Sequence, residues 1–368
     1  MYEKIMEILG KRMLFAEELS APFACSVGCH IANLFQRESK RDLFVTKGIK
    51  EDIRLPIAII SPAGLSKSYT MRQFADPTFG ILPFKSKFTG KITEAGLIGT
   101  VQKGETILGQ AYKMRDGFLC FNELSSLFFT AQSEHSSELV NQVLEILSEG
   151  SVHKDLASGS IDYKTDITIW GGTQFTRFDF SQGLGRRFLF VTKDWSDEDI
   201  LALKEARRQK GKSLDTEAKK VREGINNLHF QFDVEEIRFE DKLMEYLIKE
   251  ADTPSSMQKY EKMLIGRSVL DWDGSNVLKV GFDNGNKALV NHAIKMEMMV
   301  AEGGDLSMIL NLLSKGPKNL EYLWNMGRKF GYTLEKFLLV LNNSLQKGVI
   351  RKVVGERNTY ESRIKRGY

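Results

Sequence analysis

The amino-acid sequence predicts an α/β fold built around a mainly parallel β-sheet. Four short apolar runs lie between residues 55 and 191, and segments with helical periodicity separate them. Strands that alternate with helices indicate a parallel sheet whose two faces are both covered by helices. The runs are LPIAII, FLCF, ITIW and FLFV, which begin at Leu55, Phe118, Ile167 and Phe188.

The first run leads into a loop of small residues. Residues 57–68 read IAIISPAGLSKS, so a buried strand is followed by a turn that ends in Lys67 and Ser68. Backbone N–H groups in such a loop, and at the start of the next helix, bind phosphate. Ser61 and Ser66 stand where the GxxxxGK[ST] pattern has glycine, and a strand-turn-helix without a ligand is the alternative. The candidate nucleotide-binding residues are Ser61, Pro62, Ala63, Gly64, Leu65, Ser66, Lys67 and Ser68.

Two further runs end in polar side chains. FLCF is followed by Asn122 and Glu123, and ITIW is followed by Thr173 and Gln174 after two glycines. The carboxyl ends of parallel strands meet at one edge of the sheet, so these groups are expected near the loop. Glu123 is placed to polarise a hydrolytic water, and Thr173 or Gln174 to orient it against a γ-phosphate.

The loop SPAGLSKS resembles the Walker A loop of the minichromosome-maintenance (MCM) family of AAA+ ATPases. FTGKITEAGLIGTV, GETILGQAY and DGFLCFNELSSL, beginning at residues 88, 104 and 116, resemble in order the family's helix-2 region and its Walker B segment. The resemblance covers about residues 50–195 and implies an AAA+ P-loop core that hydrolyses ATP with Mg²⁺. Asn122 replaces the usual aspartate, and an amide holds Mg²⁺ less firmly than a carboxylate.

The resemblance also implies roles for individual residues. Lys67 would neutralise the β- and γ-phosphates, Ser68 would ligate Mg²⁺, and Asn122 would contact the metal through water. The segment GLGRRFLFV resembles the family's arginine-finger segment, with Arg187 as the finger and Arg186 as second choice. A guanidinium offers the planar, bidentate phosphate contact that this role needs. A surface arginine pair beside a strand is the alternative.

Two predicted hairpins carry candidate DNA contacts. SVHKDLASGSIDYKTD, residues 151–166, has a small-residue tip and resembles the pre-sensor 1 hairpin, which projects a lysine toward DNA; Lys154 is the candidate. A second hairpin around Gln102–Gly104 carries Lys103. Both lysines are equally compatible with ordinary solvated turns.

The chain divides into four predicted parts: a helical lead-in (1–50), the AAA+ ATPase core (51–195), a helical lid (196–300) and a winged-helix domain (301–368). The lead-in leaves no room for the β-rich N-terminal domain of complete MCM helicases. Residues 235–300 are expected to be helical, and Arg267 is the candidate for a sensor 2 arginine.

The last part is expected to be a winged helix-turn-helix. Three amphipathic helices are predicted over 305–313, 320–330 and 334–346, followed by two β-prone runs. Lys336 on the third helix, with Arg351 and Lys352 on the wing, are candidate DNA contacts. Winged helices serve equally as protein-docking modules, so that alternative stays open.

Composition adds few limits. Lys and Arg (52) exceed Asp and Glu (48) by four, which identifies no partner, and three cysteines build no disulfide framework. Cys25, Cys29 and His30 are more simply buried helix residues than a metal site, since no second ligand pair follows. No run of about 18 apolar residues predicts a membrane span. A cytoplasmic protein is expected, nucleoid-associated or encoded by a mobile element.

These observations predict an ATP-driven motor that forms a ring, a hexamer by the resemblance, on single-stranded or forked DNA during replication. Two alternatives remain. The first is a nucleotide-switched initiator, loader or regulator that seldom hydrolyses ATP. The second is an ATPase that remodels protein partners.

Overall fold

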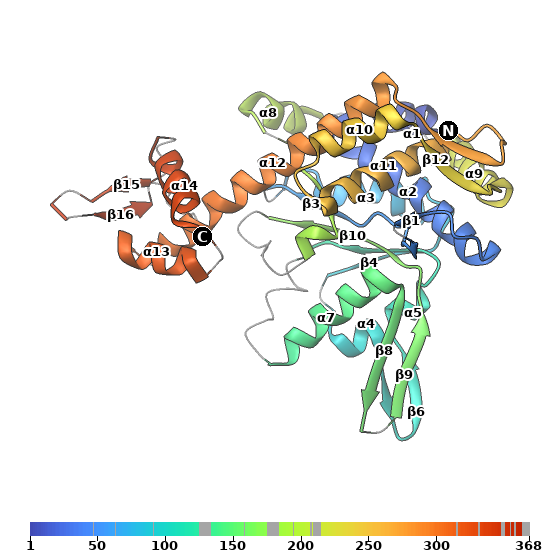
Figure 1. The fold of residues 1–368 in the computed structure, drawn as a ribbon, viewed down its shortest axis with the longest axis horizontal. Coiled ribbons are helices and arrows are strands. Elements are labelled where there is room, and N and C mark those ends of the chain that lie inside the picture. Colours follow the sequence, from blue (N-terminus) through green and yellow to red (C-terminus); the bar gives the residue numbers. More distant parts are fainter. Residues whose placement is uncertain are drawn as a thin grey trace.

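Five parallel strands form the central sheet in the order β11–β3–β10–β7–β4 (Figure 1). The predicted α/β fold with a parallel sheet is confirmed. This computed structural model describes residues 1–46, 48–62, 64–90, 92–124, 134–157, 159–174, 184–193, 195–206, 208, 215–313, 316–329, 332–346, 350–353, 355–356 and 358–362. The sheet strands are β3 (Ile57–Ile60), β4 (Ser86–Thr89), β7 (Phe118–Phe121), β10 (Thr168–Thr173) and β11 (Leu189–Val191).

Strands β3, β7, β10 and β11 each contribute to two hydrophobic clusters. Ile57 and Ile59 of β3 belong to one cluster, and Ala58 and Ile60 belong to the other. This alternation follows from the two-residue period of a strand, and it places helices on both faces. The described helices are α1 (Tyr2–Arg12), α2 (Ala16–Ser39), α3 (Lys67–Ala75), α4 (Glu94–Ile98), α5 (Gln110–Lys113), α7 (Glu134–Glu149), α8 (Asp197–Ala206), α9 (Asp215–Gln231), α10 (Asp241–Glu250), α11 (Pro254–Leu270), α12 (Asn284–Leu313), α13 (Leu320–Lys329) and α14 (Leu334–Gln346).

The expected lead-in and lid form one layer. Helices α1 and α2 share a hydrophobic cluster with α9, α10 and α11 on one face of the sheet. Helices α2 and α11 touch through their backbones, since a Cβ on Gly28 would lie 1.9 Å from the Gly266 carbonyl oxygen. Cys25 and Cys29 are buried in this layer, and the buried-helix interpretation of these residues is confirmed.

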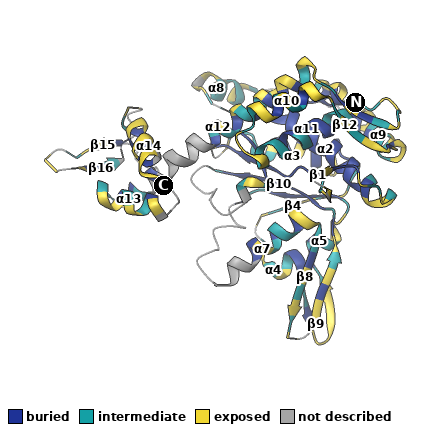
Figure 2. Cartoon of the chain, viewed as in Figure 1, coloured by how far each residue is buried: buried dark blue, intermediate teal, exposed yellow. Residues whose placement is uncertain are grey.

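Two hairpins extend from the other face of the sheet. Strands β5 (Gly99–Gln102) and β6 (Glu105–Leu108) form the first, and β8 (Ser151–Leu156) and β9 (Gly159–Lys164) form the second. Both were predicted. The hairpins point away from the sheet (Figure 1), and much of their surface is exposed (Figure 2).

One strand was not predicted, and two expectations about secondary structure are wrong. Residues 86–89, SKFT, form the edge strand β4 although only one residue there is strongly apolar. The predicted helical lid contains a parallel pair, β12 (Glu236–Phe239) and β13 (Val277–Val280). The helix expected to begin at Asp305 is the end of the 30-residue helix α12, because Gly303 and Gly304 weaken a helix without ending it.

The C-terminal part has its own small core. The end of α12 packs with α13, α14 and a three-stranded antiparallel sheet, and these elements share a separate hydrophobic cluster. Figure 1 shows this part beyond the far end of α12. The remaining strands are β1 (Val45–Thr46), β2 (Ile49–Lys50), β14 (Lys318–Asn319), β15 (Ile350–Lys352) and β16 (Thr359–Ser362).

Candidate nucleotide site

The loop after β3 has the backbone conformation that its sequence pattern requires. Gly64 has φ +80° and Ser66 has φ +55°. A left-handed conformation is strained for a residue with a Cβ atom, so Ser66 occupies a position that suits glycine. Ser61 has no such conformation; it is buried, and its Oγ donates to the Leu65 carbonyl oxygen at 3.0 Å. Ala63 lies outside the described residues.

Lys67 begins helix α3 directly after this loop. Its Nζ donates to the carbonyl oxygens of Ser61 at 2.7 Å and Pro62 at 2.8 Å. The ammonium group is therefore held against the loop at the helix N-terminus, where N–H groups and the helix dipole favour an anion.

Backbone hydrogen bonds join the loop to the end of β10, and the end of β10 to the chain after β7. The Ser61 N–H donates to the Thr173 oxygen at 3.1 Å, and the Leu124 N–H donates to the Gly172 oxygen at 2.7 Å. A Cβ atom added to Gly172 would lie 3.2 Å from the Lys67 Cβ and 3.2 Å from the backbone oxygen of Asn122. The stem of Lys67 therefore packs over β10 beside the end of β7.

Gly172 is a site residue that the sequence analysis missed. Its signal was the glycine pair inside an otherwise apolar strand, because a glycine in a strand often marks the close approach of another group.

Thr173 is fully buried at the end of β10, between the ends of β3 and β7. Its Oγ1 has no hydrogen-bond partner among the described residues. A buried hydroxyl without a partner costs about 1–3 kcal/mol, and such groups in native structures usually have an explanation. A water or phosphate oxygen bound at this edge would supply the missing partner. The neighbouring Gln174 is half-buried.

The oxygen donors here fit a magnesium ion that a nucleotide brings with it. Ser68, Asn122 and Glu123 are half-buried around the same edge. Across the part of the chain that the structure describes, no group of three His, Cys, Asp or Glu side chains is suited to a metal. Mg²⁺ keeps several water and phosphate ligands in nucleotide sites, so a hydroxyl, an amide and one carboxylate are sufficient only beside phosphate oxygens.

The arginine pair lies at the opposite edge of the sheet. Leu189 pairs with Ile57, the first residue of β3, and Arg187 precedes Leu189 by two positions. Ser61 follows Ile57 by four residues of extended chain, so the start of β3, beside Leu189, lies about 13 Å from Ser61. Arg187 is half-buried and its Nε donates to the Ser148 Oγ at 2.6 Å. Burial lowers the pKa of Arg187, and the charge of Arg186 lowers it further. The structure does not bring either arginine to the Lys67 loop of the same chain.

The candidate hairpin lysines differ in their surroundings. Lys154 lies within β8, not at the hairpin tip, and its Nζ forms an ion pair with Glu94. Lys103 occupies the exposed β5–β6 turn with φ +52°, followed by Gly104 with φ +81°. Lys103 is therefore the more accessible of the two, and DNA contact by either lysine stays a prediction.

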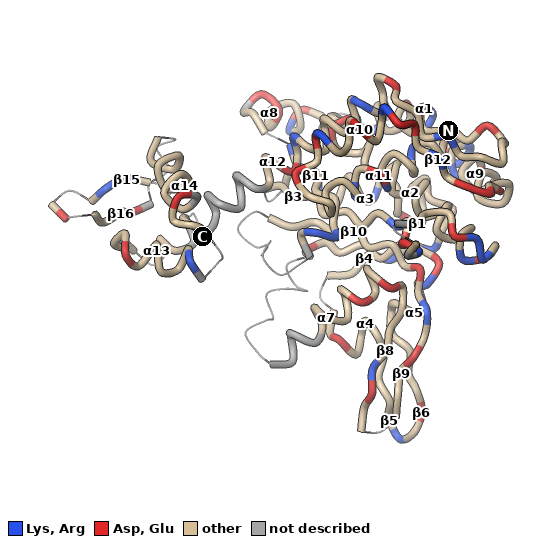
Figure 3. The backbone as a smooth tube through the Cα atoms, viewed as in Figure 1, with Lys and Arg blue, Asp and Glu red and all other residues tan. Residues whose placement is uncertain are grey.

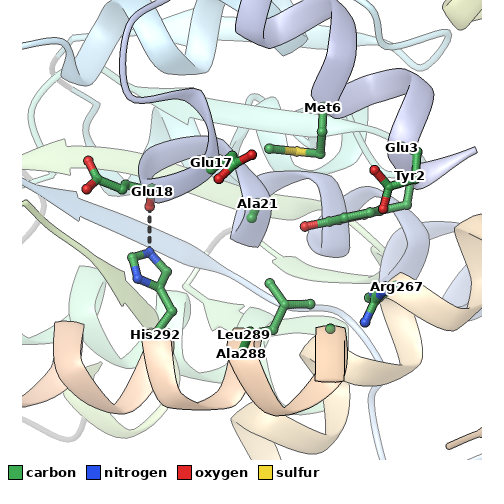
Figure 4. Close-up of a pocket in the computed structure, with 11 residues that line it drawn as sticks. Tyr2, Glu3, Met6, Glu17, Glu18, Ala21, Arg267, Ala288, Leu289 and His292 are labelled. Carbon is green, nitrogen blue, oxygen red and sulfur yellow. Dashed lines mark hydrogen bonds between the residues drawn. The ribbon is translucent and has the colours of Figure 1, made fainter. Parts of the chain in front are cut away.

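Arg267 belongs to a different pocket (Figure 4). Its Nη1 donates to the Asn286 Oδ1 at 2.7 Å and to Asp283 at 3.2 Å, and its guanidinium lies 5.4 Å from the centre of the Tyr2 ring. The pocket lies among α1, α2, α11 and α12. None of these partners comes from the Lys67 loop, so the structure does not group Arg267 with that site.

The C-terminal candidates lie on α14 and β15. Arg351 is exposed and its Nε donates to Glu361 at 2.6 Å, and the Lys352 Nζ lies 6.0 Å from the centre of the Tyr360 ring. The side chain of Lys336 lies outside the described residues. The exposed surface of α14 also includes Leu334, Leu338 and Leu339.

Comparison with known proteins adds no relatives. A scan against models of protein families found no match, and a search of curated proteins also found none. Within the described ranges, no helix combines the length and the apolar character that crossing a bilayer requires.

Proposed function

We propose that this chain is an ATP-dependent DNA motor, a helicase or translocase that forms a ring and resembles the ATPase module of MCM proteins. In this proposal the parallel-sheet domain is an AAA+ P-loop core, the helices after residue 196 act as its lid, and the C-terminal part is a winged helix-turn-helix. ATP and Mg²⁺ bind at the Lys67 loop.

The observation that carries the proposal is the grouping at the carboxyl edge of the sheet. Lys67 at a helix N-terminus, Glu123 after β7 and the Thr173 hydroxyl lie at the ends of three adjacent strands, and that hydroxyl has no hydrogen-bond partner among the described residues. A triphosphate needs a cation for its phosphates, a carboxylate for the attacking water and a polar group that orients that water. The loop and the two strand ends offer one of each.

The position of Arg187 supports a site shared between subunits. A strand length of about 13 Å between the two edges prevents this guanidinium from reaching phosphates held by Lys67 of the same chain. A neighbouring subunit in a ring presents its own amino edge to the site, so Arg187 would act there as an arginine finger.

ATP turnover, measured with and without single-stranded and forked DNA, tests the proposal. We expect turnover that DNA stimulates and that Lys67→Ala, Glu123→Gln and Arg187→Ala each abolish. Mixing Lys67→Ala with Arg187→Ala chains should restore part of the turnover, because some mixed interfaces then combine an intact Lys67 with an intact Arg187. No recovery on mixing, with each variant still assembling, would contradict a shared site. Absence of ATP binding by the unmodified chain would overturn the whole proposal.

One alternative function has support of its own. Ser66 carries backbone strain and Asn122 lacks the charge of an aspartate, and both features favour a nucleotide-switched initiator or loader with little hydrolysis. Tight ATP binding and ATP-dependent assembly without turnover would select this alternative over the motor.

The exposed leucines of α14 favour the other alternative, a remodeller of protein partners. Leu334 is 52% exposed and Leu339 is 59% exposed, on the surface that a DNA-reading helix would present. Phosphate and base contacts need charged and polar side chains. ATP turnover that is indifferent to DNA but stimulated by a protein would support this function.

A further inference from the structure

A second pocket lies at the amino edge of the sheet, where β4 and β7 begin. Its volume is 320 Å³, which lies at the lower end of the range for small-ligand sites. The Lys85 oxygen accepts a hydrogen bond from the Phe118 N–H at 2.8 Å, which locates the pocket at the start of both strands. The Lys67 loop follows the opposite ends of the strands, so the pocket is separate from the candidate ATP site.

The pocket has cationic charge that the fold does not neutralise. Lys85 and Lys113 line it and are exposed, and neither has an ion-pair partner among the described residues. Arg37 also lines the pocket, but it pairs with Asp116 and with Asp166. The two lysines therefore remain available for an anion such as phosphate.

An exposed aromatic side chain lies at the same pocket. Phe230 at the end of α9 is 76% exposed, although covering a phenylalanine ring contributes about 1.5–3 kcal/mol. The His229 ring lies 5.2 Å from the Phe230 ring and 5.3 Å from the Phe84 ring, centre to centre. The His229 ring is tilted by 43° to the Phe230 ring, so the exposed Phe230 ring presents the flat face on which a nucleobase stacks.

The pocket also holds a polar atom that lacks a partner. The Nδ1 of His229 is buried without a hydrogen bond to any described residue. Burial lowers the pKa of His229, so the ring is neutral at physiological pH and can bond the edge of a base. The amide of Asn226, one turn earlier on α9, lines the same pocket.

We propose that this pocket binds a nucleotide unit, with the base stacked on Phe230, its edge facing the His229 ring, and the phosphate bound by Lys85 and Lys113. The chemistry is shared by a free mononucleotide and by one nucleotide of a single strand. Binding here does not depend on the triphosphate site, so the Lys67→Ala variant is the suitable background for the test.

Fluorescence anisotropy with labelled single-stranded dT16 and calorimetry with dTMP distinguish the two sources. Phe230→Ala should weaken binding of the true source about 5- to 150-fold, which corresponds to the loss of one stacking contact. Replacing both lysines, Lys85→Gln with Lys113→Gln, should reduce the slope of log affinity against log salt for dT16 by about 0.7, because one phosphate loses its contacts. An oligonucleotide with 5-iodouracil should crosslink to the peptide that contains Phe230.

The control variants change residues that do not line the pocket. Phe282→Ala removes another exposed phenylalanine, and Lys249→Gln with Lys279→Gln removes two lysines from α10 and β13. These variants should leave affinity and salt slope unchanged. If Phe230→Ala and Phe282→Ala bind both probes equally, or if the salt slope does not change with Lys85 and Lys113, the pocket is not a nucleotide site. That result would leave the ATP site untouched, since ATP binding at Lys67 is measured separately.

Discussion

Arg54 and Thr173, two buried polar side chains at opposite edges of the central sheet, differ in how they are hydrogen-bonded. At the amino edge, Arg54 is 2% exposed, and its guanidinium donates to Asp52 and to the backbone oxygens of Thr165, Ile167 and Ile146. At the carboxyl edge, Thr173 is also buried, but its Oγ1 has no hydrogen-bond partner among the described residues.

The difference separates polar groups that hold the fold from polar groups held for a ligand. The Arg54 network ties the end of α7 to the chain that enters β10, and it leaves few donors unused. At the carboxyl edge, the Thr173 hydroxyl lacks a partner among the described residues and Ser66 is strained, and both features reduce stability. Such costs persist where a bound ligand compensates for them. The following variants distinguish polar groups that stabilise the fold from polar groups that bind a ligand.

The largest expected effect on stability comes from Arg54. Arg54→Met should lower the free energy of unfolding by about 3–5 kcal/mol, because Asp52 and three carbonyl oxygens would remain buried without their partner. Urea unfolding measures the change. Arg238→Met is the control: Arg238 pairs with Glu236 at an exposed position, where an ion pair contributes about 0–1 kcal/mol. Similar losses in the two variants would show that the Arg54 network does not stabilise the amino edge.

The next effect depends on pH and on His30, also at the amino edge. The backbone carbonyl oxygen of Asp116 can only accept a hydrogen bond, so Nε2 of this buried histidine carries the proton. Nδ1 then accepts a hydrogen bond from the Thr168 hydroxyl. Burial lowers the pKa of His30 from 6.5 to about 3. Below pH 6.5 the unfolded chain therefore binds a proton that the folded chain does not, and stability falls as the pH decreases toward 3.

Between pH 6.5 and 4.5 this difference should reduce the free energy of unfolding by about 2–3 kcal/mol more in the unmodified chain than in His30→Gln. Urea unfolding at a series of pH values measures both profiles. Parallel profiles would mean that another group causes the acid sensitivity.

A smaller effect, of opposite sign, is expected at the carboxyl edge. Ser66→Gly should raise stability by up to about 1 kcal/mol, because glycine adopts a positive φ without a Cβ clash. The same change should strengthen ATP binding by relaxing the loop. Lys103→Gly is a matched control with φ +52°, and it should change stability similarly without affecting ATP binding. Thermal unfolding and nucleotide titration distinguish the two variants, and a loss of stability in Ser66→Gly would contradict the strain argument.

Sequence patterns predicted the sheet where residue types were decisive. Continuous apolar runs identified β3, β7, β10 and β11, and the rule that parallel strands end at one edge predicted the grouping of Lys67, Glu123 and Thr173. Strand β4 was not predicted, because an edge strand needs few apolar residues and its sequence SKFT resembles a loop.

Residues whose surroundings depend on distant segments were harder to predict. The partner of Lys154 is Glu94, 60 positions earlier in the chain, and this pairing arises only when β8 packs beside α4. Arg267 likewise bonds side chains at the start of α12. Neither contact follows from periodicity or spacing, so the sequence indicated a charged residue without its partner.

The smallest expected effect on stability is the most informative about function. Thr168 and Thr173 are both fully buried in β10, at its amino and carboxyl ends. Thr168→Val should cost about 1–3 kcal/mol, because the buried Nδ1 of His30 loses its hydrogen-bond donor, and ATP turnover should persist. Thr173→Val removes a hydroxyl without a described partner, so stability should change by less than about 1 kcal/mol.

Turnover should nevertheless fall at least tenfold in Thr173→Val if that hydroxyl orients the attacking water. Unfolding and ATP hydrolysis are measured on both variants. Thr168→Val should lose stability and keep turnover, whereas Thr173→Val should keep stability and lose turnover. If Thr173→Val instead loses as much stability as Thr168→Val while turnover remains, the hydroxyl of Thr173 serves the fold. Thr173 would then not differ from Arg54, since both buried polar side chains would serve to stabilise the fold.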